Sequence, residues 1–186
     1  MAGVLALSSV ACGAAQSGGS TGMTGAKVEA ALNGSTMNNG HFTANGYSVS
    51  GPNRYAVAGE GDLQRTPVEA LQMAVSIQTY TGLGAVGVKV IEIGGRTYTS
   101  FAGAAWTSTQ STSTFPSNVP TDYIGEETRA GVKVWHVEEV NNGDIGDEWV
   151  RESDGYLVYQ TFTGADGATQ DLLFTTYNQS PAIKAP

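Results

Sequence analysis

Histidines and paired carboxylates are the residues of this chain whose side chains could perform acid–base or metal chemistry. His41 and His136 are the only histidines, and neither has a second metal ligand or a catalytic base at a recognised spacing. The pairs Glu126–Glu127 and Glu138–Glu139 could supply an acid and a base, but adjacent residues of a strand point to opposite faces. We therefore interpret the histidines as structural and the glutamates as solvated, and we expect no catalytic residue.

Three further segments match functional motifs only in part. Residues 18–22 have the nucleophile pattern of hydrolases but lie in a Gly/Ser/Ala tract instead of a strand-to-helix turn. Residues 82–87 match the dinucleotide fingerprint, yet a strand-like segment follows where that motif needs a helix. The acidic turn of Asp144, Asp147 and Glu148 lacks the spacing of an EF-hand loop. We expect neither a cofactor nor a metal site.

Composition excludes several classes of protein. The 186 residues suffice for one ordinary domain, and charged residues make up only 14%, against roughly 25% in a typical soluble protein. A net charge of -8 without any cluster of Lys or Arg argues against nucleic-acid binding. The single cysteine excludes an internal disulfide, and no segment approaches the roughly 20 apolar residues of a membrane-spanning helix.

The first residues resemble the end of a bacterial lipoprotein signal. An apolar segment leads through the small residues Val10 and Ala11 to Cys12, and a Gly/Ser/Ala tract follows. We expect residues 1–12 to be a partial signal segment, Cys12 to be the lipidation site, and residues 13–25 to form a flexible tether before a domain at 26–186. A disordered tail with an incidental cysteine is the alternative.

The elements that follow are mostly strands. Thr24 is a suitable N-cap for a short amphipathic helix that Asn33–Gly34 could end. Leu71, Met73, Val75 and Ile77 alternate with polar or small residues, which is the pattern of a strand buried on one side. Gly94–Gly95 predicts a primed turn between the strands 86–93 and 96–101. We expect a loop with one helical turn over 107–114.

Further strands are predicted from Val132 to Tyr177, separated by short Asn-, Asp- and Gly-containing turns. Strands joined by such turns are antiparallel. The predicted fold class is therefore α+β, with about nine or ten strands in a curved, incompletely closed antiparallel sheet packed on one or two helices. A sheet of that size tends to curl or close.

Three stretches together resemble the LppX/LprAFG-type lipoproteins. They are residues 124–136, with a G-x-E-T-x-x-G-V-x-x-x-H pattern, the strand-turn-strand 148–158, and the ending 181–186. Residues 59–63 and 94–98, followed by Trp106, fit the earlier strands, so the resemblance spans about residues 26 to 186. It implies the half-barrel fold of the lipoprotein carriers LolA and LolB, with an apolar cavity that holds acyl chains.

The resemblance makes the alternating strand a candidate wall of that cavity. We expect Leu71, Met73, Val75 and Ile77 to face inside, with Val88, Val90 and Tyr98 as neighbours on adjacent strands.

The implied function is a lipid-binding lipoprotein, exported and lipid-anchored to the outer face of the cytoplasmic membrane or cell envelope. Its partners would be a lipid or acylated molecule and the membrane, without nucleic acid. An extracytoplasmic sensor that binds an envelope partner protein, similar to RseB, is the alternative.

Overall fold

The computed structural model describes residues 22–78, 84–111 and 121–186, and within these ranges it contains one helix and eleven strands. Their bounds are α1 (Gly25–Gly34), β1 (Asn39–Ser50), β2 (Asn53–Gln64), β3 (Ala70–Gln78), β4 (Ala85–Ile93), β5 (Arg96–Phe101), β6 (Thr107–Gln110), β7 (Thr121–Arg129), β8 (Val132–Asn141), β9 (Asp144–Arg151), β10 (Leu157–Thr163) and β11 (Thr169–Tyr177). The described part of the chain has no helix long and apolar enough to cross a membrane.

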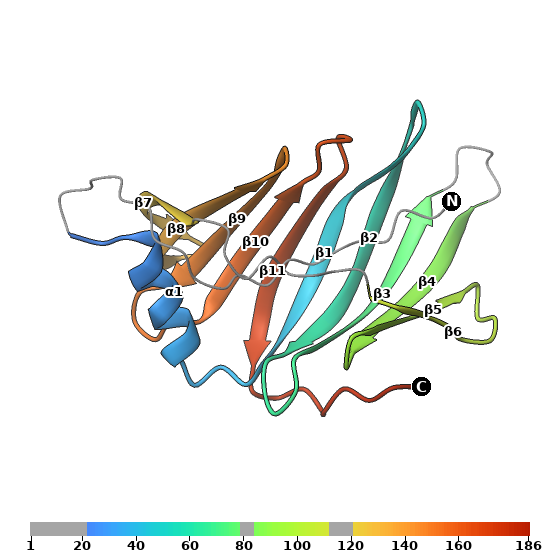
Figure 1. Cartoon of the computed structure of the whole chain (residues 1–186), viewed down its shortest axis with the longest axis horizontal. Helices are drawn as coiled ribbons and strands as arrows, with labels where there is room; N and C mark the ends of the chain where they lie inside the picture. Colours follow the sequence, from blue (N-terminus) through green and yellow to red (C-terminus); the bar gives the residue numbers. More distant parts are fainter. Residues whose placement is uncertain (1–21, 79–83, 112–120) are drawn as a thin grey trace. The chain divides into compact units, whose positions relative to one another are not determined.

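The strands form one antiparallel sheet that is not closed. The hydrogen-bonded order is β6-β5-β4-β3-β2-β1-β11-β10-β9-β8-β7, so β6 and β7 are the two end strands (Figure 1). The predicted α+β class with an open antiparallel sheet is thereby confirmed. Consecutive strands are neighbours except β6 and β7, which stand at opposite ends of the order, and the last strand, β11, pairs with the first, β1.

One segment that we expected to be irregular is a strand. Thr107–Gln110 forms β6, paired with β5 through Thr97–Thr109 and Thr99–Thr107, where we expected a loop with a helical turn. The physical reason is that β-branched threonine suits an extended backbone once a neighbouring edge offers pairing. Thr121–Arg129 forms β7, a further strand that we did not predict. Strands β6 and β7 bring the number of strands in the described residues to eleven rather than nine or ten.

The strands and the helix divide between two compact units. Of the described residues, unit 1 comprises 37–78, 84–111 and 172–186, and unit 2 comprises 22–36 and 121–171. Unit 1 thus holds β1 to β6, most of β11 and the C-terminal tail. Unit 2 holds α1 and β7 to β10.

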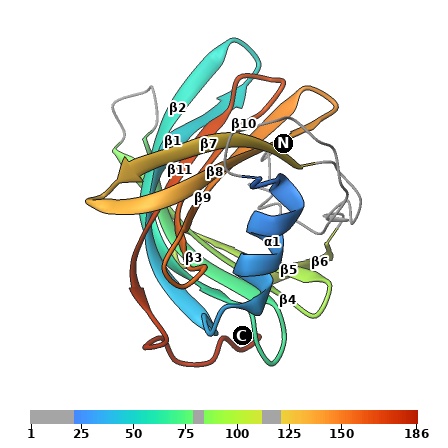
Figure 2. The same ribbon diagram turned by 90° about the vertical axis from the view of Figure 1, so that its left-hand side faces the viewer.

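In unit 2, helix α1 begins and ends as its sequence predicts. The Thr24 side chain accepts a hydrogen bond from the backbone N–H of Lys27 at 3.3 Å, and the helix stops at Gly34. Gly25 is buried so close to the backbone of Thr121 that a Cβ there would overlap the Thr121 carbonyl oxygen. The absence of a side chain therefore lets α1 pack against β7 and β8 (Figure 2).

The β4–β5 hairpin of unit 1 also follows its sequence. Gly94 and Gly95 have φ angles of 59° and 73°, which is the left-handed conformation that a primed turn requires. Ile93 then pairs with Arg96, and this two-residue turn sets which side chains share a face along both strands.

Candidate functional site

Strand β3 buries one side and exposes much of the other. Leu71, Met73 and Val75 are buried, with Val75 only 4% exposed, while Ala74 and Ser76 between and beyond them are exposed. Ile77 continues the buried series at the end of the strand but is half-buried. The alternation has the period of two that a strand with one apolar face produces.

The register places the buried side of β3 beside apolar residues of β4. Met73 lies opposite Val90, and Val75 lies opposite Val88. Both valines are buried. Together with residues of the adjoining strands this forms a continuous surface, which we call the apolar face and which consists of Phe42, Ala44, Val57, Leu71, Met73, Val75, Ile77, Val86, Val88, Val90 and Phe101.

Tyr98 does not belong to this face. It pairs with Ile91, whereas Val90 pairs with Thr99 and Val88 with Phe101. The expectation that Tyr98 neighbours Val88 and Val90 on one face is therefore corrected. A two-residue turn at Gly94–Gly95 makes odd-numbered residues of β5 face even-numbered residues of β4, so Tyr98 points to the opposite side.

Strand β1 contributes two buried residues that sequence reasoning did not nominate. Phe42 and Ala44 lie opposite Gly61 and Gly59 of β2. A Cβ on Gly61 would lie 2.6 Å from Cζ of Phe42, so the missing side chain makes room for the ring. Phe42 also contacts Phe174 of β11, with ring centroids 5.5 Å apart. The alternation of Phe42 and Ala44 with polar residues was the pattern in the sequence that could have identified them as buried.

One end of the apolar face carries a carboxyl group. Glu92 lies opposite Leu71 on one side and Thr97 on the other, and Thr97 Oγ1 donates a hydrogen bond to Glu92 at 3.0 Å. Burial raises the pKa of Glu92, and the hydrogen bond from Thr97 only partly offsets this. The face therefore ends here in a group that takes up a proton more readily than an ordinary glutamate.

The other end of the apolar face is open. Ile77 and Val86 are half-buried, and Phe101, opposite Val88, is 44% exposed. Exposure thus increases towards the end of β3 and the start of β4. This is the side from which an apolar molecule would have access to the face.

The opposite face of the same strands carries polar groups that are paired with one another. Asp62 accepts hydrogen bonds from Ser180 at 2.6 Å and from Gln72 at 2.8 Å, and its carboxylate lies 3.0 Å from His41 Nδ1. Burial alone would raise the pKa of Asp62, but the hydrogen bonds from Ser180, Gln72 and His41 outweigh it and lower the pKa. This network fastens the C-terminal tail to the sheet.

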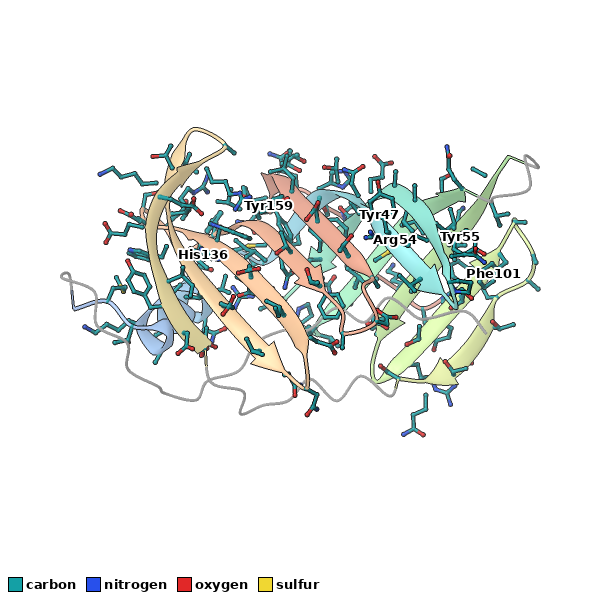
Figure 3. All side chains as sticks on the ribbon, turned by 90° about the horizontal axis from the view of Figure 1, so that it is seen from above. Tyr47, Arg54, Tyr55, Phe101, His136 and Tyr159 are labelled. Atoms are coloured by element: carbon teal, nitrogen blue, oxygen red, sulfur yellow. The ribbon has the colours of Figure 1, made fainter. Side chains whose placement is uncertain are left out.

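In unit 2, aromatic rings and charged groups form a cluster on β7 to β10. His136 stacks on Trp149, with ring centroids 4.3 Å apart, and its Nε2 lies 2.8 Å from Asp147. The guanidinium of Arg129 lies over both Trp149, at 3.8 Å, and Tyr159, at 4.0 Å. Figure 3 labels His136 and Tyr159 in this unit. We call these residues, with Glu127, the aromatic cluster.

The polar groups of the aromatic cluster are engaged with each other. The Trp149 indole N–H donates to Glu127, and Thr161 donates to Asp147 at 3.0 Å. Burial raises the pKa of Tyr159, as does the nearby Asp171 carboxylate, against the opposing effect of Arg129. His136 is held by its stack on Trp149 and by its contact with Asp147.

The acidic turn and the carboxylate pairs form no common site. Asp144 accepts the backbone N–H of Ala165 at 2.8 Å, and Glu148 accepts Gln160 at 3.0 Å. Glu126 and Glu127 are both exposed, and Glu127 accepts the indole N–H of Trp149. Among residues 22–78, 84–111 and 121–186, no three His, Cys, Asp or Glu side chains are grouped so that they could hold a metal ion.

Cys12 and the segments 1–12 and 13–21 lie outside the described residues. Lipidation at Cys12 and the proposed boundaries of the signal and the tether therefore remain predictions from the sequence.

Comparisons with known proteins found similarity in fold only. No protein-family model and no curated protein matches the chain. A solved structure of LprF from Mycobacterium bovis is 12% identical, covers 86% of this chain and 97% of its own, and has a TM-score of 0.49. A chain of the MucA/MucB complex of Pseudomonas aeruginosa is 14% identical. The match covers 84% of this chain and 58% of that one, with a TM-score of 0.43. An outer membrane lipoprotein-sorting protein domain from Vibrio parahaemolyticus is 8% identical. The match covers 84% of this chain and 91% of that one, with a TM-score of 0.36. LprF is one of the LppX/LprAFG-type lipoproteins that the sequence resembles.

Proposed function

We propose that the apolar face of unit 1 binds the acyl chains of a lipid or lipidated molecule, and that the protein carries or shields them outside the cytoplasmic membrane. The proposal assigns no catalytic residue. Glu92 and Thr97 would lie at the closed end of the bound chain, and Phe101 at the open end.

The observation that carries the proposal is an apolar face in a unit built of strands. Within its described residues, the secondary structure of unit 1 consists of strands alone. A sheet with one apolar face normally packs it against a second layer of helices or strands. An acyl chain would extend such a layer over the open end of the face, at Ile77, Val86 and Phe101, where each Å² of apolar surface that it buries stabilises the complex by about 25 cal/mol.

The chemistry of the face fits a ligand that is stored unchanged. Aliphatic side chains such as Val75, Met73 and Val90 offer contact without hydrogen-bond donors or acceptors. Apolar contact of this kind is non-directional and tolerates chains of different length. On the reverse of the sheet, Asp62 and His41 are paired with each other.

The proposed location rests on the first residues. We propose that Cys12 is acylated and tethers an exported protein to the membrane. A Cys12→Ser variant should then appear in the soluble fraction of lysed cells, while the unsubstituted protein stays in the membrane pellet after a salt wash. Recovery of both in the pellet at equal levels would contradict the anchor.

Mass spectrometry of co-purifying lipid tests the function. The full chain is extracted in detergent from the envelope, and its lipid content is compared with that of Val88→Thr/Val90→Thr, which buries two hydroxyls on the apolar face at nearly constant volume. Val140→Thr is the matched control, because Val140 is 54% exposed. We expect a defined lipid that falls at least fivefold in the double variant, as loss of about 1 kcal/mol of affinity predicts.

Equal lipid content in the folded double variant would overturn the assignment to this face. An unsubstituted protein without lipid, but with a stoichiometric co-purifying envelope protein, would support the sensor alternative instead.

A further inference from the structure

The turn between β5 and β6 exposes six consecutive residues without a polar side chain. Residues 101–106 read Phe-Ala-Gly-Ala-Ala-Trp, and all six are exposed. Phe101 and Trp106, at the two ends of the run, are 44% and 37% exposed. Single exposed apolar residues are common, but a contiguous run of them indicates a surface that contacts another apolar phase.

The backbone of this turn is hydrogen-bonded within the protein. The N–H of Ala104 donates to the carbonyl of Phe101 at 2.8 Å, and Ala102 and Gly103 have φ angles of 49° and 77°. The N–H of Ala102 donates to Gly87 at 2.8 Å, and the Ser100 hydroxyl donates to the Ala104 carbonyl at 2.6 Å. These hydrogen bonds reduce the cost of moving the turn into an apolar environment, because they pair backbone groups that would otherwise lose their contact with water.

The charges on this side of unit 1 are mainly positive, although the whole chain carries -8. Lys89 lies opposite Ser100 and is exposed, and the exposed Glu60 lies in the same row of the sheet, two strands away. Beyond this row, towards the turn ends of unit 1, the described residues 44–59, 75–78, 84–88 and 101–106 contain one charged side chain, the exposed Arg54. Arg54 stacks on Tyr47 at 4.6 Å. The two cations outnumber the single carboxylate, and cations beside aromatic rings complement the anionic headgroups of a bilayer.

We propose that this end of unit 1 docks on the surface of an anionic lipid bilayer through the β5–β6 turn. Phe101 and Trp106 insert at the level of the headgroups, and Lys89 and Arg54 face the lipid phosphates. Figure 3 labels Phe101, Tyr55, Tyr47 and Arg54 on the unit 1 strands that reach this end. The docking requires neither an acyl group on Cys12 nor a lipid on the apolar face. Phe101 also borders the open end of that face, so docking would place the opening at the bilayer.

Flotation with lipid vesicles tests the proposal. The probe is the full chain with Cys12→Ser, so that no anchor contributes, mixed with vesicles of phosphatidylcholine with and without phosphatidylglycerol. We expect binding to the anionic vesicles, reduced at least tenfold in Phe101→Ser/Trp106→Ser and weakened by added salt. The matched control is Val140→Ser/Leu173→Ser, which also removes two exposed apolar side chains and should bind as before.

Fluorescence quenching locates the contact. Acyl chains brominated near the headgroup should quench tryptophan emission of the docked protein, and Trp106→Phe should abolish that quenching while most of the binding remains. Equal vesicle binding by the Phe101→Ser/Trp106→Ser variant, or quenching that survives Trp106→Phe, would overturn the proposal. So would failure of the Cys12→Ser chain, without further substitutions, to float with the anionic vesicles. Lipid content measured by mass spectrometry is independent of these readouts, so failure of the docking and failure of the proposed function are distinguishable.

Discussion

The apolar face of unit 1 and the aromatic cluster of unit 2 are built on the same kind of antiparallel strand, yet they use their side chains differently. Val75, Met73 and Val90 contact their neighbours without any hydrogen bond of their own side chains. In the aromatic cluster, Trp149 and His136 each contact a ring and a carboxylate at once. The apolar face can contact any apolar group, whereas the polar groups of the aromatic cluster are already bound to one another.

This difference separates a candidate binding surface from a structural one. Hydrogen bonds and cation–π contacts are directional. A ligand that displaced the partners of Trp149 or Arg129 would therefore have to offer equivalent groups at the same positions. Apolar contact depends mainly on the area removed from water. This difference favours unit 1 over unit 2 for the proposed lipid binding, and the following substitutions test it from the largest expected effect to the smallest.

Val75→Asp places a charge in the middle of the apolar face. We expect loss of bound lipid together with destabilisation of more than about 4 kcal/mol, because an unpaired buried charge is among the most costly substitutions. Thermal unfolding and lipid mass spectrometry measure both effects. Ser76→Asp, on the exposed side of the same strand, is the control and should stay within about 0.5 kcal/mol of the unsubstituted protein. An unchanged Tm in Val75→Asp would show that this side of β3 is not buried.

Trp149→Ala breaks the aromatic cluster instead. Trp149 is 5% exposed and contacts His136, Arg129 and Tyr159, so its truncation should destabilise the protein by about 3–5 kcal/mol. Lipid content of the fraction that remains folded should not change. If lipid is lost while near-native circular dichroism is retained, the cluster takes part in binding and the comparison fails.

Ser180→Ala removes one donor to the half-buried carboxylate of Asp62 and should cost about 1.5 kcal/mol at neutral pH. Because the folded-state pKa of Asp62 lies below its ordinary value, its stabilisation is present above the unfolded pKa and is lost as pH falls through the folded pKa. The difference between variant and unsubstituted protein should therefore shrink in acid. Denaturant unfolding from pH 7 to pH 3 measures this, and a difference that is constant with pH would contradict the network.

Glu139→Gln should stabilise unit 2 by less than about 1 kcal/mol at neutral pH. Burial raises the pKa of Glu139, as does the nearby carboxylate of Glu29 on α1. A carboxyl with a raised folded-state pKa destabilises the protein above that pKa, and the penalty disappears as pH falls below the ordinary pKa. The gain in Tm should accordingly vanish in acid. Glu138→Gln is the control, because the side chain of Glu138 points to the face of β8 opposite that of Glu139.

Tyr98→Ser should have the smallest effect on lipid content. The register turns Tyr98 away from Val88 and Val90, so lipid per protein should equal that of the unsubstituted protein within error. Loss of lipid in this variant, at unchanged Tm, would restore the original placement of Tyr98 on the apolar face.

Much of the local structure could be read from the sequence. Alternation in β3 identifies Leu71, Met73 and Val75 as one face, because side chains of a strand repeat every two residues. The cap at Thr24 and the turn at Gly94–Gly95 were also predictable, because capping and positive φ angles depend on residues that are close in the sequence. Even the placement of Tyr98 was available, because the turn length alone sets the pairing of β4 with β5.

Only the tertiary structure determined which segments far apart in the sequence pair or contact one another. Ser180 binds Asp62 across 118 positions of sequence, and β11 pairs with β1. Arg129 lies over the rings of Trp149 and Tyr159, and Thr107–Gln110 becomes a strand only beside β5. Periodicity and turn geometry act over a few residues, whereas strand order and side-chain pairing between strands depend on the folded neighbours that each surface finds.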